Sequence, residues 1–115
     1  MARQREKRCG EIILNMANIY LIGPRACGKT TLGRALAKRL ELPFVDTDIF
    51  LQEKVGLSIA EIVAQKGWDY FRELEEQIFK EISRQGPQVV STGGGIVLRP
   101  ANREILKSSM YVFYL

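Results

Sequence analysis

Eight consecutive residues constrain this chain more than any other stretch. Residues 23–30, Gly-Pro-Arg-Ala-Cys-Gly-Lys-Thr, fit G-x-x-x-x-G-K-[ST], the loop that cradles nucleotide phosphates. The flanks are the required ones, because apolar Ile19–Ile22 is typical of a buried strand and residues 31–40 are typical of a helix. Backbone N–H groups of such a loop point at phosphate oxygens, and the dipole of the following helix favours negative charge. The motif therefore predicts a nucleotide-binding site and, as a working hypothesis, a nucleotide-dependent phosphotransferase.

The motif also assigns individual roles. Lys29 would neutralise the β- and γ-phosphates, and the Thr30 hydroxyl would bind a nucleotide-bound magnesium ion. The residues expected to contact the nucleotide are consecutive: Ala26, Cys27, Gly28, Lys29, Thr30 and Thr31. In the helix that follows, we expect Leu32, Leu36 and Leu40 to form one apolar face.

Length and composition limit what this site can serve. The chain has 115 residues, of which 46% are hydrophobic and 26% charged, as in an ordinary soluble domain. No apolar run approaches the roughly 20 residues that span a bilayer, so we expect no membrane association. The net charge is +4, and residues 1–15 carry half of it with four basic and two acidic side chains. We therefore predict a basic, flexible tail over residues 1–16, one domain over residues 17–115, and no nucleic-acid partner.

Cysteine and histidine usage narrows the chemistry. Cys9 and Cys27 have neither a disulfide framework nor metal-ligand spacing, which favours a reducing cytoplasm. Cys27 is either a small residue of the loop or a redox-sensitive thiol near a helix N-terminus. The chain has no histidine, which excludes Ser-His and Cys-His catalysis. A general base must then be a carboxylate.

Two carboxylates follow the second predicted strand, Phe44-Val45-Asp46. Asp46 and Asp48 stand at its C-terminal end, where open α/β sheets bind their ligands. One of them could face magnesium and the other a hydroxyl-bearing substrate. Alternatively they form an N-cap pair for a helix that begins at Ile49. The residues alone leave both interpretations open.

Three helices are predicted next, over residues 49–55, 58–66 and 68–85. Ser58 and Glu61 form a capping box that fixes the start of the second. The third has a buried stripe of Phe71, Leu74, Ile78 and Ile82, and we expect Trp68 to be a core or hinge residue. Arg72 could pair weakly with Glu75 or Glu76 on the surface, or bind a substrate carboxylate with its planar fork.

A glycine tract follows the third predicted strand, Gln88-Val89-Val90-Ser91. Gly93, Gly94 and Gly95 at the end of a strand allow close approach to the backbone, which favours a substrate or phosphate contact over a flexible linker. A last helix is predicted from Pro100 at N1 to about Ser108, and residues 111–115 form a fourth strand.

These motifs resemble, in order and in spacing, those of the shikimate kinase family. The resemblance rests on the phosphate loop, Asp46-Thr47-Asp48-Ile49-Phe50, Gly67-Trp68, Phe71-Arg72-x-x-Glu75 and Ser91-Thr92-Gly93-Gly94-Gly95. It covers residues 18–115 and implies ATP-dependent phosphorylation of the shikimate 3-hydroxyl on the route to aromatic amino acids. It also implies a P-loop α/β/α fold with a parallel sheet of order 2-3-1-4.

The resemblance further implies site roles. Thr30 and Asp46 would place Mg²⁺, with ATP as co-substrate. Lys29 and Asp48 would be catalytic, Asp48 as the base that also contacts the shikimate hydroxyls. Arg72 and the tract Gly93, Gly94 and Gly95 would hold the shikimate carboxylate and ring.

Family members are longer, and their fourth strand is followed by an arginine-bearing lid, a fifth strand and an adenine-binding loop. We expect this chain to lack these parts, and we note Met16 as an alternative start and Ala26 where the family usually has glycine. The fourth strand would then be an edge, open to association through Tyr111–Leu115 of an otherwise monomeric protein. Two hypotheses follow: a shikimate kinase, or a catalytically inactive nucleotide- or shikimate-binding remnant of one.

Overall fold

Four parallel strands form the centre of the molecule. The computed structural model describes residues 17–24 and 28–115. The strands are β1 (Ile19–Ile22), β2 (Phe44–Asp46), β3 (Val89–Ser91) and β4 (Tyr111–Tyr114), in the order β2-β3-β1-β4. This is the predicted order, and every pairing is parallel, with Tyr20 opposite Val90 on one side and Val112 on the other. The carboxyl ends of all four strands therefore meet at one edge of the sheet.

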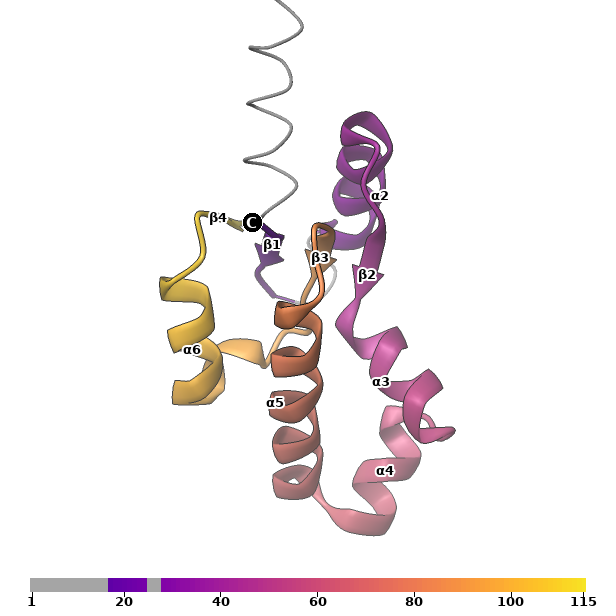
Figure 1. Ribbon diagram of the computed structural model, residues 1–115. Helices are drawn as coiled ribbons and strands as arrows, with labels where there is room; N and C mark the ends of the chain where they lie inside the picture. The colour runs from indigo at the N-terminus through magenta and orange to yellow at the C-terminus, as the bar shows by residue number, and fades with distance from the viewer. Residues whose placement is uncertain (1–16, 25–27) are drawn as a thin grey trace, which may run out of the picture.

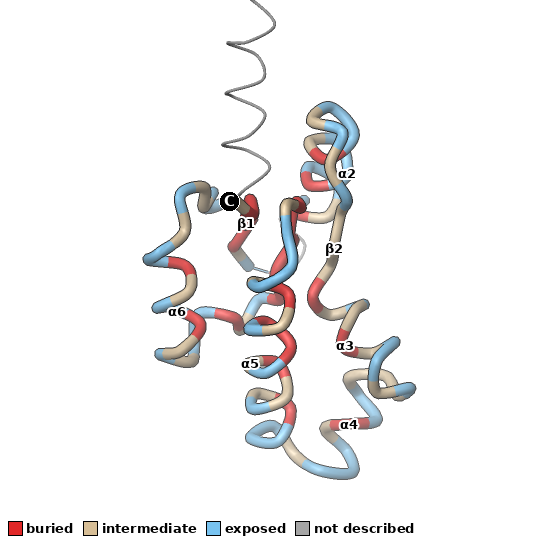
Figure 2. The backbone as a smooth tube through the Cα atoms, in the orientation of Figure 1, coloured by how far each residue is buried: buried red, intermediate tan, exposed pale blue. Residues whose placement is uncertain are grey.

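Helices cover both faces of this sheet (Figure 1). They are α2 (Lys29–Leu40), α3 (Thr47–Val55), α4 (Ile59–Lys66), α5 (Trp68–Arg84) and α6 (Pro100–Lys107). Ile19 and Leu21 of β1 pack into a small core with Ala37 of α2. Tyr20 and Ile22 point the other way, into the larger core that α3 to α6 close. The alternation of strand side chains thus builds the predicted three layers, with β1 and β3 buried between them (Figure 2).

The buried face of α2 differs from the predicted one. Leu32 is 46% exposed, while Gly33 and Ala37 are the apolar residues that face the sheet. A Cβ on Gly33 would lie only 2.5 Å from a ring carbon of Phe44. Because the helix packs on the sheet through its smallest residues, the predicted leucine face lies at the edge of the contact. Leu36 and Leu40 pack there and are partly buried.

The helices of the larger core largely follow the predictions. The capping box of Ser58 and Glu61 is present, with both hydrogen bonds at 3.1 Å. Phe71, Ile78 and Ile82 of α5 are buried as predicted, and Leu74 is partly buried. Trp68 was predicted to be a core or hinge residue, and its exposure of 57% shows that the core alternative was wrong. Its ring meets Phe71 edge-on at the start of α5.

Beyond β3, the glycine tract leads into a 3₁₀ turn, η1 (Ile96–Leu98), that the sequence did not predict. Pro100 stands in the first turn of α6, as expected. Strand β4 is an edge strand on which Phe113 is 49% and Tyr114 78% exposed. Within residues 17–24 and 28–115, no helix combines the length and apolar character needed to cross a bilayer.

Candidate active site

A cavity of about 310 Å³ opens at the carboxyl ends of the strands and gathers most of the predicted nucleotide and metal residues. Its lining comes from three segments: Gly28, Lys29, Thr30 and Thr31; Asp46 and Asp48; and Ser91, Thr92, Gly93 and Gly94. Segments far apart in the sequence therefore meet because each lies at or just after the carboxyl end of a strand of one parallel sheet.

The phosphate loop has the expected geometry where the structure describes it. Gly28 is the N-cap of α2 at φ +88°, a left-handed conformation that glycine adopts without strain. The Lys29 side chain is buried, and its ammonium donates to the carbonyls of Gly23 and Pro24, both at 2.7 Å. The charge of Lys29 thus lies within its own loop, beside the N-terminus of α2. Ala26 and Cys27, also predicted to bind ATP, lie outside the described residues.

Asp46 caps a helix, as one of the two interpretations held, and it also faces the phosphate loop. Its Oδ1 accepts from the backbone N–H groups of Asp48 at 3.0 Å and Ile49 at 3.2 Å, so it is the N-cap of α3, which begins at Thr47 rather than at Ile49. Its Oδ2 accepts from the Thr30 hydroxyl at 3.2 Å. One carboxylate therefore caps a helix and faces the phosphate loop at the same time.

The Thr30–Asp46 pair is suited to a nucleotide-bound divalent cation. Mg²⁺ prefers oxygen ligands, keeps several waters and usually takes one or two carboxylates plus substrate phosphates. A hydroxyl beside a carboxylate at a phosphate loop fits that donor set. In the described part of the chain, no three or more His, Cys, Asp or Glu side chains lie together in a way that could hold a metal ion.

A second cavity, of about 230 Å³, adjoins the first. It is lined by Asp48, Ile59, Trp68, Phe71, Arg72, Glu75, Gly94 and Gly95. Asp48 and Gly94 line both cavities, so a carboxylate and a glycine form the boundary between them. The lining combines two aromatic rings, the cation of Arg72 beside those rings, and two carboxylates, so it offers both apolar and charged contacts to a small ligand.

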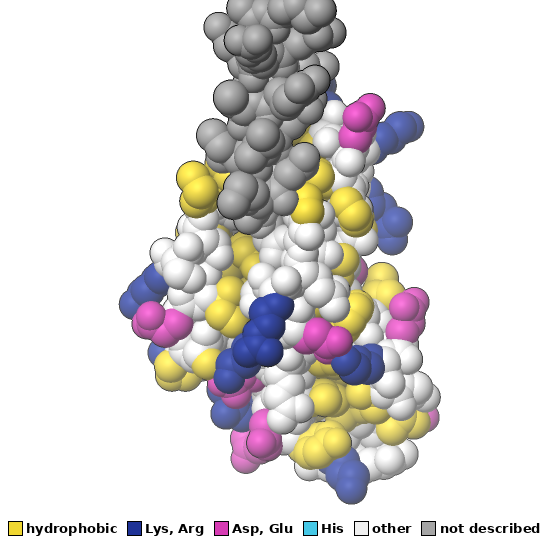
Figure 3. Space-filling view, in the orientation of Figure 1, with side chains coloured by type: hydrophobic (Ala, Val, Ile, Leu, Met, Phe, Trp, Pro, Cys, Tyr) yellow, Lys and Arg dark blue, Asp and Glu magenta, His cyan; other side chains and the backbone are white. Residues whose placement is uncertain are grey.

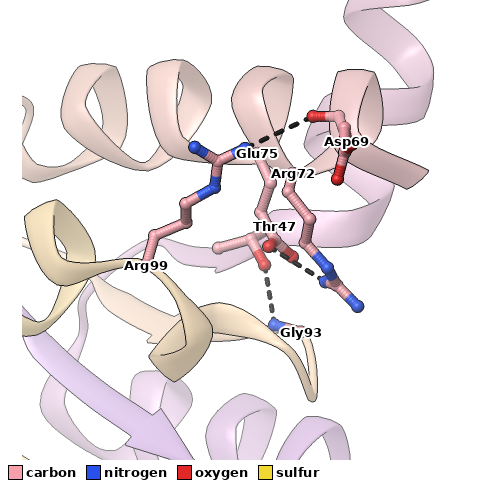
Figure 4. A network of polar contacts seen from close by, with 6 residues as sticks. All are labelled: Thr47, Asp69, Arg72, Glu75, Gly93 and Arg99. Atoms are coloured by element: carbon pink, nitrogen blue, oxygen red, sulfur yellow. Dashed lines mark hydrogen bonds and ion pairs between the residues drawn. The ribbon is translucent and has the colours of Figure 1, made fainter. Parts of the chain in front are cut away.

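Arg72 forms the ion pair with Glu75 that was one prediction for it, but the pair is largely buried rather than on the surface. Its Nη1 donates to Oε1 of Glu75 at 3.1 Å, and the two side chains are 23% and 3% exposed (Figure 4). The guanidinium also lies 5.3 Å from the ring centroids of Trp68 and Phe71. Aromatic rings and a buried carboxylate thus hold the planar fork at the wall of the second cavity.

Glu75 is a site residue that sequence reasoning missed. Burial raises the pKa of its carboxyl above the ordinary value, although the hydrogen bond and charge of Arg72 act in the opposite direction. The nearby charge of Asp48 raises this pKa further, and that of Arg99 lowers it. The available signal was a charged residue within the apolar stripe of α5, four residues after Phe71 and three before Ile78.

The glycine tract lies against two side chains that were predicted to bind the substrate, Asp48 and Arg72. A Cβ on Gly93 would lie 2.6 Å from Oδ1 of Asp48, and one on Gly95 would lie 2.1 Å from Nη1 of Arg72. Close approach was predicted, and in this structure the approaching groups are side chains of the chain itself. Any larger residue at Gly93 or Gly95 would displace Asp48 or Arg72.

Two further contacts frame this region (Figure 4). The Thr47 hydroxyl accepts from the backbone N–H of Gly93 at 2.9 Å, and Arg99 donates to the backbone carbonyl of Asp69 at 3.4 Å. The first joins the start of α3 to the glycine tract, and the second joins the residue before α6 to the first turn of α5. Neither could be deduced from a sequence pattern.

The chain was compared with protein families and with known proteins. The family model described as shikimate kinase matches residues 25–115. The shikimate kinase 2 of Syntrophotalea carbinolica is 44% identical over 97 residues, which cover 84% of this chain and 56% of that protein. The shikimate kinase 2 of Enterobacter sp. (strain 638) is 48% identical over 97 residues, which cover 84% of this chain and 55% of that protein.

Solved structures agree with the sequence matches. Shikimate kinase from Acinetobacter baumannii in complex with shikimate has a TM-score of 0.86 and 38% identity, covering 91% of this chain and 59% of that one. Shikimate kinase from Aquifex aeolicus has a TM-score of 0.80 and 39% identity, covering 85% of this chain and 58% of that one. The chain thus spans a little over half the length of the relatives that it matches.

Proposed function

Because this chain belongs to the shikimate kinase family, we propose that it transfers the γ-phosphoryl group of ATP to the 3-hydroxyl of shikimate. The observation that carries the proposal is the pair of adjoining cavities, one at the phosphate loop and one at Arg72, which share Asp48 and Gly94. In-line phosphoryl transfer needs a donor and an acceptor side by side more than it needs covalent help.

The donor cavity would hold the triphosphate. Lys29 and the backbone N–H groups of the loop, including those of Ala26, Cys27, Gly28, Thr30 and Thr31, would bind the phosphate oxygens. To do so, the Lys29 ammonium would exchange its bonds to the Gly23 and Pro24 carbonyls for bonds to phosphate. Thr30 and Asp46 would hold Mg²⁺, which supplies neutralisation of the β- and γ-phosphate charge when bound.

The acceptor cavity would hold shikimate. The fork of Arg72 would bind the substrate carboxylate, and the backbone of Gly93, Gly94 and Gly95 would lie along the ring. Asp48, at the boundary of the two cavities, would accept the proton of the 3-hydroxyl as the hydroxyl oxygen bonds to the γ-phosphorus and ADP leaves. That position supports its assignment as the general base.

A monomer is our proposal for the active unit. On the face seen in Figure 3, basic and acidic side chains are interspersed, which fits a small-molecule enzyme better than a nucleic-acid binder. We place the reaction in the cytoplasm and treat the β4 edge, Tyr111–Leu115, as the route by which copies would associate.

A coupled assay for ADP release with purified protein, ATP, Mg²⁺ and shikimate tests the proposal. We expect shikimate-dependent turnover that Lys29→Ala and Asp48→Asn abolish. Lys38→Ala removes an exposed lysine from the last turn of the same helix and should leave turnover unchanged. The names of the relatives favour a kinase over an inactive remnant, and absence of turnover in a folded protein that binds shikimate would reverse that preference.

A further inference from the structure

Thr47 stands between two residues with proposed roles but has none assigned to it. Asp46 faces Thr30, and Asp48 lines both cavities. The Thr47 side chain points elsewhere: it is 2% exposed, and its hydroxyl accepts the N–H of Gly93 in a buried bond of 2.9 Å. Asp46, Thr47 and Asp48 are consecutive, and their side chains reach the phosphate loop, the glycine tract and the two cavities, respectively.

The bond to Thr47 is the side-chain anchor of the glycine tract. The residue before the tract, Thr92, is held to β1, since its N–H and its hydroxyl both donate to the carbonyl of Leu21, at 3.1 and 2.8 Å. At Gly93 the chain leaves the sheet, and its carbonyl accepts from Ile96 at 3.2 Å in the turn that follows. The Thr47 hydroxyl therefore determines where the chain lies as it passes from strand to turn.

That position matters because the tract touches the groups proposed to act on the acceptor. Asp48 lies against Gly93 and Arg72 lies against Gly95, each within the space that a Cβ would need. A displacement of the tract by a fraction of an ångström would open or close this contact for both side chains. The phosphate loop follows a different strand, β1, and the Thr47 hydroxyl bonds to the glycine tract instead.

We infer that Thr47 is a positioning residue for the acceptor half of the site: its hydroxyl holds the glycine tract against Asp48 and Arg72. The inference rests on the proposed function, in which a hydroxylated carboxylate, shikimate, occupies that half. It assigns Thr47 an effect on shikimate binding with little effect on nucleotide binding.

The test compares Thr47→Val, which keeps the shape and removes the hydroxyl, with Thr47→Ser, which keeps the hydroxyl. Gln88→Met is the control. It removes one buried hydrogen bond of 2.9 Å and one partly buried bond of 3.0 Å just before β3, the strand whose other end leads into the glycine tract. Amide hydrogen exchange at Gly93 measures the anchor directly. Fluorescence of Trp68, the only tryptophan and a residue of the acceptor cavity, follows shikimate titration, and calorimetry follows ADP binding.

In Thr47→Val, we expect the amide hydrogen of Gly93 to exchange about tenfold faster. Shikimate binding to this variant should weaken by about tenfold, which is the effect of losing one ordinary buried hydrogen bond. Its affinity for ADP should stay within about twofold of the wild-type value, and Thr47→Ser should restore shikimate binding. Gln88→Met should lower the unfolding temperature without weakening shikimate binding.

Unchanged exchange at Gly93 in Thr47→Val would overturn the inference whether or not shikimate binds. So would equal losses of shikimate and ADP affinity, or a loss of shikimate affinity in Gln88→Met as large as that in Thr47→Val. Failure of the wild-type protein to bind shikimate, with exchange at Gly93 still dependent on the hydroxyl, would refute the proposed function and leave the anchor in place.

Discussion

Gly95→Ala is the sharpest test of how Arg72 is held. The new methyl carbon would lie 2.1 Å from Nη1, 2.4 Å from Cζ and 2.6 Å from Nη2 of the guanidinium. The φ of Gly95 is −95°, which any L-residue adopts, so the backbone has no reason to yield. Because ordinary van der Waals contact begins near 3.4 Å, the guanidinium must withdraw by about 1.3 Å.

Such a displacement breaks the 3.1 Å bond between Arg72 and Glu75 and turns the fork away from the acceptor cavity. A hydrogen bond to a charged group contributes about 1.5 to 3 kcal/mol. If the substrate carboxylate loses one such bond, shikimate affinity should fall by about 10- to 100-fold. Stability should also fall, by about 1 to 3 kcal/mol, because the displaced guanidinium leaves the Glu75 carboxylate, 3% exposed, without this bond.

The assay is shikimate titration by Trp68 fluorescence in four proteins: wild type, Gly95→Ala, Arg72→Ala and the double variant. If the methyl acts only through Arg72, it should cost nothing further once Arg72 is already alanine. Wild-type affinity in Gly95→Ala would refute the steric reasoning. An equal loss in the Arg72→Ala background would show that the methyl acts on the substrate directly.

Three further outcomes are expected. Since the folded-state pKa of Glu75 is raised, its contribution to stability is complete below the unfolded pKa and is lost as pH rises through the folded value. Urea unfolding should therefore show Glu75→Gln gaining stability relative to wild type between about pH 4 and pH 7, and a pH-independent difference would contradict this. In thermal unfolding, Asp46→Asn should keep the free energy of unfolding within about 0.5 kcal/mol of wild type, because Asn caps a helix as well as Asp does. The same variant should weaken Mg²⁺-dependent ATP binding, and Asp46→Ala should lose both stability and ATP binding. Gly33→Ala should destabilise the protein by up to about 2 kcal/mol in chemical unfolding, because overpacking against Phe44 costs about 1–3 kcal/mol and the better helix propensity returns about 1 kcal/mol. A more stable variant would mean that α2 can move away from the sheet.

The chain order of strands and helices could be predicted because each left a local pattern. The phosphate loop identified its own strand and helix, and the capping box located the start of α4. The strand order came from the family resemblance, and it was confirmed. Periodicity failed at α2, since it assumes that large apolar residues form the contact, whereas this helix packs through Gly33 and Ala37.

Much of the candidate site could be proposed from single residues, but their relations could not. Asp46 was left between two roles because a sequence cannot show that one oxygen caps a helix while the other meets Thr30. Glu75 was missed as a site residue since its burial depends on how other segments pack over α5, although its ion-pair partner, Arg72, lies on the same helix. The same holds for Thr47 and Gly93, which are 46 residues apart and meet only in the folded sheet.

The division of the site between two cavities has a consequence for the evolution and redesign of specificity. The donor side comes from the segments that follow the strands, whereas most of the acceptor wall comes from α4 and α5, with Ile59, Trp68, Phe71 and Arg72. Substitutions on those helices can reshape the acceptor cavity for a different small acid and leave the nucleotide-binding residues unchanged. Only Asp48 and Gly94 belong to both halves, so these two positions should resist such diversification.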